Sequence, residues 1–191
     1  SAAAAMRGTV WDSGTVHTSD PFADYAGPAL RPRTRYWWNV EVRDDQGRRA
    51  RASAPRWFET GFTHPAQWKA DWIGGLPRPS GCEEQRRCSP APLLRREFRV
   101  RGALEGARLY ASGLGYGTYH LNGHRVGDAV LSPGFTEYTE RALYTTSDVT
   151  SLLRGGHNTI GAELGRGPYG SEGDNYAGYS TAPWHAEPRL R

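Results

Sequence analysis

The chain has 191 residues, of which 12% are aromatic, and it is rich in Gly (24) and Pro (13), a mixture that favours short strands and turns over helices. Its net charge is +4. The positive charge is almost entirely Arg interspersed with acids, which argues against nucleic-acid binding and indicates a solvated surface. No apolar run is long enough to cross a membrane. The dense Trp and Tyr rings fit either a β-sandwich core or stacking on sugar rings.

Residues 1–61 predict part of an all-β sandwich. A strand is expected where Tyr36, Trp38, Val40 and Val42 alternate on one face, and a turn follows at 45–47. Residues 56–62 predict a second short strand. A complete sandwich of this kind needs about seven strands and about 100 residues, so we expect this first domain to be partial.

Residues 62–92 are punctuated by Pro and Gly and predict a linker leading into a second domain. Cys82 and Cys88 stand in this segment, separated by five residues. Two thiols alone cannot form a structural zinc site. A local disulfide between them is favoured, with free thiols as the alternative, and such a disulfide favours secretion over a cytoplasmic location. The first residues, SAAAAMRG, lack the features of a signal peptide, so any secretion signal is expected upstream.

Residues 93–191 predict a second all-β domain, a jelly-roll β-sandwich, whose opening strand could begin near residue 68. Asn122-Gly123 predicts a two-residue hairpin turn, because both residues tolerate positive φ. His120 and His124 flank that turn and could face each other as a metal pair, although turn decoration is favoured. Residues 148–158 predict a single helical turn with Asp148 or Thr150 as its N-cap.

Several motifs in this second part occur in a fixed order. They are WKADWIGG (68–75), PLLRREFRV (92–100) and, within 107–167, LNG, RVGD, LSPG, DVT-x-LL, G-x-N-x-IG and LG-x-G. Together they resemble the N-terminal β-sandwich module of bacterial α-L-rhamnosidases, glycoside hydrolase family 78. Upstream, TRYWWNVEVRDDQG and FETG resemble the fibronectin-type-III-like domain that precedes this module, so residues 1–61 are interpreted as a partial domain of that type.

The resemblance implies a parent enzyme that hydrolyses terminal α-L-rhamnosyl residues from glycosides or polysaccharides. The family's paired catalytic carboxylates sit in a later (α/α)6 barrel, which is absent from this chain, so no residue here is assigned a catalytic role. The chain is then expected to position the barrel or to bind rhamnose. Two alternatives stay open: a structural spacer without a ligand, and a free-standing lectin-like protein. Pro168 stands where family members commonly have Trp, which favours the spacer.

The candidate binding site lies in the long polar loop near the C-terminus. Asp174 and Asn175 are oxygen donors on a Gly-rich loop, and such donors suit Ca²⁺. The resemblance implies that calcium could present open positions to sugar hydroxyls, with Asn122 and Trp184 completing a carbohydrate-binding site. The alternative is an Asx-turn in a solvated loop.

Overall fold

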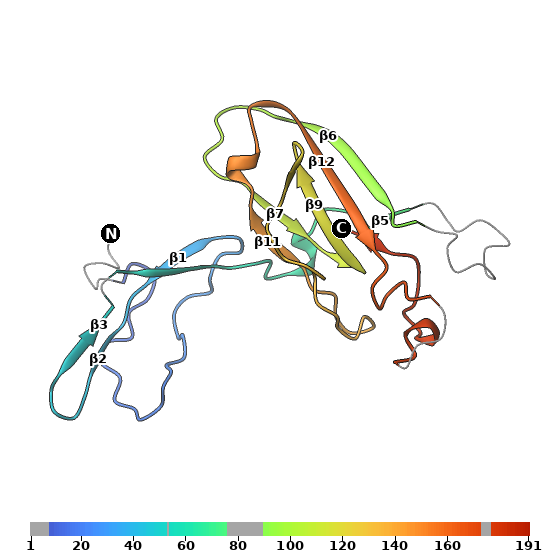
Figure 1. Cartoon of the computed structure of the whole chain (residues 1–191). Helices are drawn as coiled ribbons and strands as arrows, with labels where there is room; N and C mark the ends of the chain where they lie inside the picture. Colours follow the sequence, from blue (N-terminus) through green and yellow to red (C-terminus); the bar gives the residue numbers. More distant parts are fainter. Residues whose placement is uncertain (1–7, 53, 76–89, 173–176) are drawn as a thin grey trace. The chain divides into compact units, whose positions relative to one another are not determined.

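The computed structural model describes residues 8–52, 54–75, 90–172 and 177–191, and these residues form strands, short 3₁₀ turns and loops (Figure 1). The all-β prediction is confirmed. None of the helices in these ranges has the length and apolarity that crossing a bilayer requires. The chain divides into two compact units, residues 1–69 and residues 70–191.

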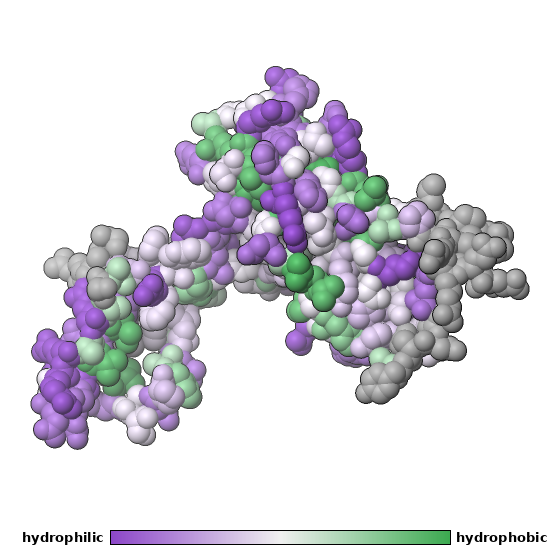
Figure 2. All heavy atoms as spheres, viewed as in Figure 1, coloured by the Kyte–Doolittle hydropathy of each residue, from purple (hydrophilic) through white to green (hydrophobic). Residues whose placement is uncertain are grey.

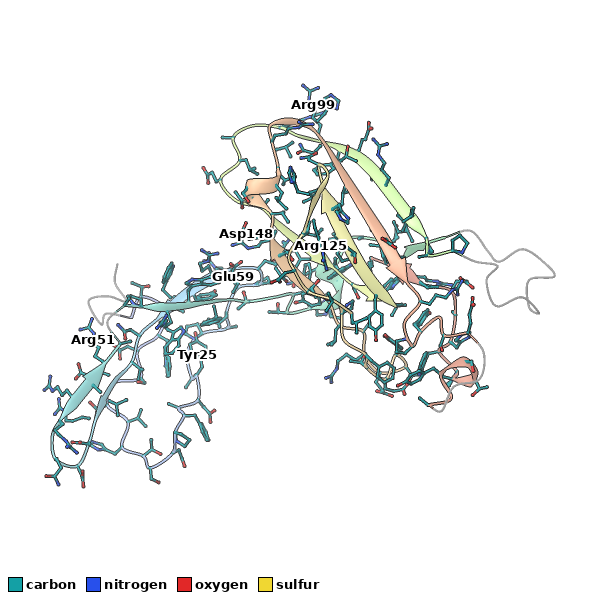
Figure 3. All side chains as sticks on the ribbon, viewed as in Figure 1. Tyr25, Arg51, Glu59, Arg99, Arg125 and Asp148 are labelled. Atoms are coloured by element: carbon teal, nitrogen blue, oxygen red, sulfur yellow. The ribbon has the colours of Figure 1, made fainter. Side chains whose placement is uncertain are left out.

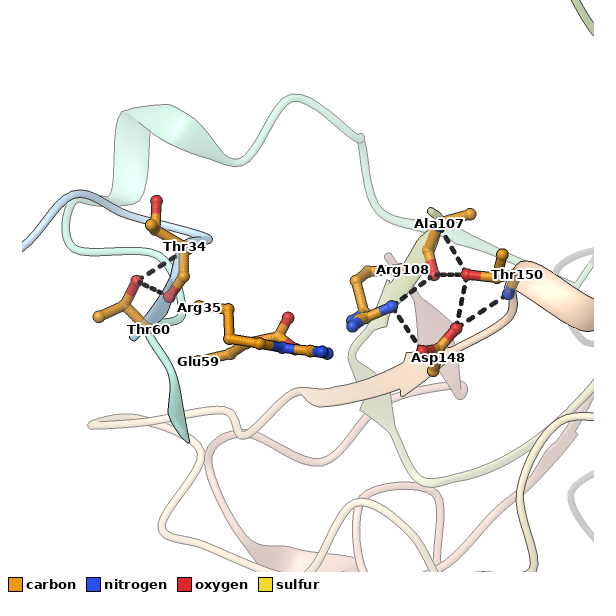
Figure 4. Close-up of polar contacts among 8 residues, drawn as sticks. All are labelled: Thr34, Arg35, Glu59, Thr60, Ala107, Arg108, Asp148 and Thr150. Atoms are coloured by element: carbon orange, nitrogen blue, oxygen red, sulfur yellow. Dashed lines mark hydrogen bonds and ion pairs between the residues drawn. The ribbon is translucent and has the colours of Figure 1, made fainter. Parts of the chain in front are cut away.

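The first unit is built on one long interrupted hairpin. Its elements are β1 (Arg35–Trp38), β2 (Glu41–Arg43), β3 (Arg49–Arg51), β4 (Arg56–Glu59) and the 3₁₀ turn η1 (Pro65–Gln67). β1 pairs with β4 and β2 pairs with β3, both antiparallel. At the open end of the hairpin, Thr34 and Thr60 are joined by backbone and side-chain hydrogen bonds of 3.0 Å (Figure 4).

The apolar face predicted for the first strand is only partly buried. Tyr36 stacks on Phe58, with ring centroids 5.7 Å apart, as expected for neighbours on one face. Val40 and Val42, however, are 48% and 59% exposed. Hydrophobic residues therefore reach the surface of this unit (Figure 2).

The second unit carries the larger sheets. Its strands are β5 (Ile73–Gly74), β6 (Leu93–Val100), β7 (Arg108–Ala111), β8 (Gly113–Leu114), β9 (Tyr116–Leu121), β10 (His124–Arg125), β11 (Thr145–Asp148), β12 (Gly156–Gly165) and β13 (Arg189–Leu190), with 3₁₀ turns η2 (Thr150–Leu152) and η3 (Tyr179–Thr181). An antiparallel sheet has the order β10-β9-β12-β6. Smaller sheets have the orders β5-β13-β8 and β11-β7.

The core lies on one face of the four-stranded sheet. Tyr119 and Leu121 of β9 and Leu164 of β12 are buried, and the register places them on the same side of the sheet. The Tyr119 hydroxyl lies 3.6 Å from the position that a Cβ on Gly113 of β8 would take. The β8 sheet therefore packs over this face, which gives the second unit two layers.

The β9–β10 connection confirms the predicted hairpin. Leu121 pairs with His124, so the turn consists of Asn122 and Gly123 alone. Their φ angles are 51° and 85°, the left-handed conformation for which an Asn-Gly pair is suited.

The predicted helical turn is present, as the 3₁₀ turn η2, but its cap differs from the prediction. Val149 occupies the N-cap position without a side-chain hydrogen bond. The Asp148 carboxylate instead accepts hydrogen bonds from the N–H and hydroxyl of Thr150 and pairs with Arg108 at 2.8 Å (Figure 4). Asp148, the last residue of β11, therefore makes an Asx-type hydrogen bond to Thr150 across the N-cap residue Val149.

Candidate functional site

Four aromatic rings from three segments converge on Trp184, just before β13. Its ring centroid lies 5.1 Å from Tyr138, 5.9 Å from Phe135, 6.0 Å from Tyr179 and 6.2 Å from Tyr169. Phe135 and Tyr138 come from the loop between β10 and β11, Tyr169 follows β12, and Tyr179 lies in η3. We call these five residues the aromatic cluster.

The cluster has one buried ring, Tyr169, three half-buried rings and one exposed ring, Phe135. Tyr169 is 8% exposed and lies nearly parallel to Trp184, at 12°, while Tyr138 stands edge-on to both. Burial raises the pKa of the Tyr138 hydroxyl, and the neighbouring Tyr116 adds to that rise. Phe135 is 42% exposed. The exposed Phe135 ring, packed against the other rings of the cluster, offers an apolar surface on which another flat apolar group can stack.

Arg166 ties together the two segments that carry Tyr169 and Trp184. Its guanidinium binds the carboxylates of Glu172 and Glu187, each at 3.1 Å. Since the Arg166 side chain is only 18% exposed, these pairs are shielded from water more than surface ion pairs usually are. A hydrogen bond of 2.8 Å between the His185 ring and the Ser171 carbonyl adds a second tie.

The structure places one predicted site residue, Trp184, in this cluster. Asp174 and Asn175 lie outside the described residues, as do Cys82 and Cys88, so the calcium and disulfide assignments stay predictions. Glu172, the described residue directly before that loop, pairs with Arg166 at 3.1 Å. No group of three metal-ligating side chains occurs within the described ranges.

The side chain of Asn122 serves the fold. Its amide nitrogen donates to the Leu152 carbonyl at 2.9 Å and to the Asn158 side-chain oxygen at 2.8 Å, and its oxygen accepts from the Thr159 N–H at 2.9 Å. These contacts lie at the start of β12, whereas the aromatic cluster lies beyond its end. At about 3.3 Å per residue, the six residues from Thr159 to Gly165 separate them by roughly 20 Å. Asn122 and Trp184 therefore do not belong to one site.

The two histidines at the hairpin also fail to form a site. His120 pairs with Arg125, and His124 pairs with Leu121. Because successive residues of a strand point to opposite faces, His120 and His124 lie on opposite sides of the hairpin. The possibility that they face each other was wrong, since the register of a two-residue turn does not allow it.

Sequence reasoning missed four of the five rings and the Arg166 tie. One signal was available, because GFTEY (134–138) places two aromatics directly after the turn-forming Pro133, where rings have no strand face to fill. The convergence itself had no local signal, since the rings come from positions up to 49 residues apart in sequence.

Comparison with known families decides the identity of both units. Residues 102–191 match the α-L-rhamnosidase N-terminal domain, and residues 1–64 match the Rha78A-like N-terminal immunoglobulin domain. The chain belongs to the N-terminal region of the α-L-rhamnosidase family. Its resemblance to glycoside hydrolase family 78, expected from the motifs, is thereby confirmed.

Individual rhamnosidases support the same assignment. An α-L-rhamnosidase of Formosa agariphila is 33% identical over 181 residues, which cover 84% of this chain and 19% of the relative. The solved α-L-rhamnosidase of Dictyoglumus thermophilum has a TM-score of 0.77 and 34% identity, covering 95% of this chain and 20% of that one. The chain thus spans about a fifth of the length of these rhamnosidases.

A third rhamnosidase supports the fold alone. The Streptomyces avermitilis α-L-rhamnosidase, solved in complex with L-rhamnose, has a TM-score of 0.78 at 23% identity, covering 95% of this chain and 33% of that one. The shared fold therefore covers both units of the rhamnosidase N-terminal region.

Proposed function

We propose that this chain is a non-catalytic accessory region of an α-L-rhamnosidase, and that its second unit binds the terminal L-rhamnose of a glycoside at the aromatic cluster. The observation that carries the proposal is the exposed Phe135 ring packed against the half-buried Trp184, which in turn stacks on the buried Tyr169. Aromatic rings stack on the apolar faces of pyranoses. The sequence prediction that Asp174 and Asn175 contribute, with Ca²⁺, is retained as part of this proposal.

The described carboxylates support a non-catalytic role. Glycoside hydrolysis needs two carboxyl groups that flank one bond, one of them able to give up a proton. Glu172 and Glu187 lie close in sequence to Tyr169 and Trp184 of the cluster, and both bind the Arg166 guanidinium. These two carboxylates therefore serve to hold two segments of the chain together through Arg166.

The proposal is tested by isothermal titration of L-rhamnose into the chain, with CaCl₂ and with EDTA. We expect binding heat for the unaltered chain and none for Phe135→Ala or Trp184→Ala. Tyr144→Ala is the matched control, since Tyr144 is an exposed aromatic residue of the same unit outside the cluster. Circular dichroism checks that each variant is folded. If the folded chain releases no heat under either condition, only the structural spacer role is left.

A separate assay tests the non-catalytic part of the proposal. We expect the purified chain to release no nitrophenol from 4-nitrophenyl α-L-rhamnopyranoside. Turnover that persists after further purification would contradict the accessory role directly.

A further inference from the structure

The first unit carries an aromatic surface that the proposed rhamnose site does not use. In the β1–β4 pair, Trp37 lies directly opposite Trp57. Residues that oppose each other in a sheet point to the same side, and so do residues two positions along the same strand. Arg35 and Glu59, which are also paired, therefore share this side. We call these four residues the Trp37–Trp57 face.

The two indoles of this face are open to solvent. Trp37 is 54% exposed and Trp57 is 51% exposed. A Trp side chain is usually highly buried because it carries a large apolar surface. On the opposite side of the same hairpin, Tyr36 and Phe58 stack on each other, although Phe58 is still 41% exposed.

Charged groups border the indoles at one end. The Arg35 guanidinium lies 4.1 Å from the centre of the Trp57 ring, and it pairs with the Glu59 carboxylate at 2.7 Å. Glu59 is labelled on β4 in Figure 3, and Figure 4 shows its carboxylate beside Arg35. Because it stacks on the Trp57 ring and pairs with the Glu59 carboxylate, the Arg35 side chain is held so that it reaches from β1 to β4. Hydrogen-bond donors and acceptors thus stand beside an apolar platform.

The size of the face limits what can bind it. An aromatic side chain buries about 150–250 Å² when fully covered, so two half-exposed indoles offer roughly 200 Å² of further burial. A stable protein interface needs about 800 Å² per partner. The face is thus too small to be a protein interface by itself, whereas its ribbon of two strands, about 5 Å apart, matches the width of a sugar ring.

We propose that the Trp37–Trp57 face binds a second stretch of the glycan chain, separate from the terminal rhamnose. A pyranose C–H face stacks on the Trp37 indole and on the part of the Trp57 indole that the Arg35 guanidinium leaves open. Sugar hydroxyls donate to Glu59 and accept from Arg35. The proposal rests on the proposed function, since it takes the ligand to be a glycan of the kind that a rhamnosidase processes. It adds a binding surface on the first unit, with its own specificity for pyranose chains.

The test is affinity gel electrophoresis of the full-length protein in gels containing rhamnogalacturonan I, with excess free L-rhamnose to saturate sites for the terminal sugar. We expect the unaltered protein to be retarded and the Trp37→Ala/Trp57→Ala variant to bind about tenfold more weakly, a loss of roughly 1.4 kcal/mol. Trp38→Ala is the matched control and is expected to keep the full retardation, since Trp38 is 47% exposed and points to the opposite side of the same hairpin. Equal retardation of the unaltered protein and the double alanine variant would overturn the proposal, as would absence of retardation in the unaltered protein.

A second variant guards against unfolding. Trp37→Phe/Trp57→Phe keeps an aromatic ring at each position but reduces the platform, and we expect intermediate retardation with an unchanged melting temperature. Retardation of this variant as weak as that of the double alanine variant, at an unchanged melting temperature, would count against the stacking surface. L-rhamnose titration of the double alanine variant separates the two proposals. If this variant binds rhamnose and its retardation in the glycan gel equals that of the unaltered protein, the inference is refuted and the proposed function stands.

Discussion

At the scale of single residues, the buried side-chain amide of Asn158 joins the start of β12 to the β9–β10 turn and to the residues that precede β12. Asn158 is 2% exposed, and its side chain makes hydrogen bonds with Arg154, Gly156 and Asn122. Every donor and acceptor of this amide is thus in use. Removing it leaves several buried partners without a hydrogen bond, which is more damaging than losing a solvated one.

We therefore expect Asn158→Ala to lower the free energy of unfolding by about 3 kcal/mol, measured by urea denaturation. Asn122→Gly is the informative comparison, because Gly retains the left-handed turn while removing the side-chain bonds. It should be destabilising by a smaller amount, since part of the Asn158 network survives. A neutral effect of Asn158→Ala would mean that the network does not stabilise the fold.

Tyr119 gives a prediction on pH dependence. Burial raises the pKa of its hydroxyl from 10.0 to about 12, and in the described chain that hydroxyl has no hydrogen-bond partner. Between pH 10 and 12 the folded state retains a proton that the unfolded state releases. Stability is therefore fully present below pH 10 and decreases as the pH rises toward 12.

Tyr119→Phe should remove this part of the alkaline loss and be nearly neutral at pH 7, because it deletes a buried hydroxyl without orphaning a partner. Thermal melts at pH 7, 10 and 11 provide the measurement, with Tyr144→Phe as the exposed control. If Tyr119→Phe and the unaltered protein lose stability in parallel above pH 10, Tyr119 is not the group responsible for the alkaline loss.

At the scale of secondary-structure elements, two glycines with positive φ should differ in importance. Gly123, in the β9–β10 turn, has φ of 85° and open space where a Cβ would stand. Gly115, between β8 and β9, has φ of 109°, and a Cβ there would lie 2.4 Å from the Gly165 carbonyl oxygen of β12. That oxygen belongs to the backbone of a paired strand, so it cannot move aside cheaply.

Gly123→Ala should therefore be destabilising by about 1 kcal/mol, from backbone conformation alone. Gly115→Ala should exceed about 3 kcal/mol, because a backbone clash adds to the conformational term. Chemical denaturation of the two variants side by side measures the difference. Similar losses would mean that β9 and β12 can separate locally to admit the methyl group.

The same elements show what local sequence can predict. The Asn122-Gly123 turn was predictable because its geometry depends on two adjacent residues. The alternation of β6 and the core strand β12 was predictable because side chains repeat with period two. The hydrogen bond between Asn122 and Asn158 was not predictable, since it joins residues 36 positions apart, and neither residue signals its partner. The aromatic cluster was not predictable for the same reason, because its rings meet only after the loops have folded.

At the scale of the whole chain, the two units differ in how much core they possess. Within the described residues, the buried hydrophobic side chains all belong to the second unit, between Ala111 and Tyr169. The first unit pairs its strands only two by two, and a two-stranded hairpin is marginally stable without a packed face. Local stability should follow this difference, because opening a region with few buried apolar contacts requires little free energy.

Hydrogen exchange monitored by mass spectrometry measures that difference in the 191-residue chain. We expect the amides of β1 and β4 to exchange at least about tenfold faster than those of β12, which is paired on both sides, since a difference of 1.4 kcal/mol in opening free energy corresponds to that factor. Leu164 of β12 is fully buried, so Leu164→Ala should speed exchange in β12 and leave β1 and β4 unchanged if the units open independently. Acceleration in both would show that they open as one cooperative structure, and the division into two compact units would then describe geometry without describing stability.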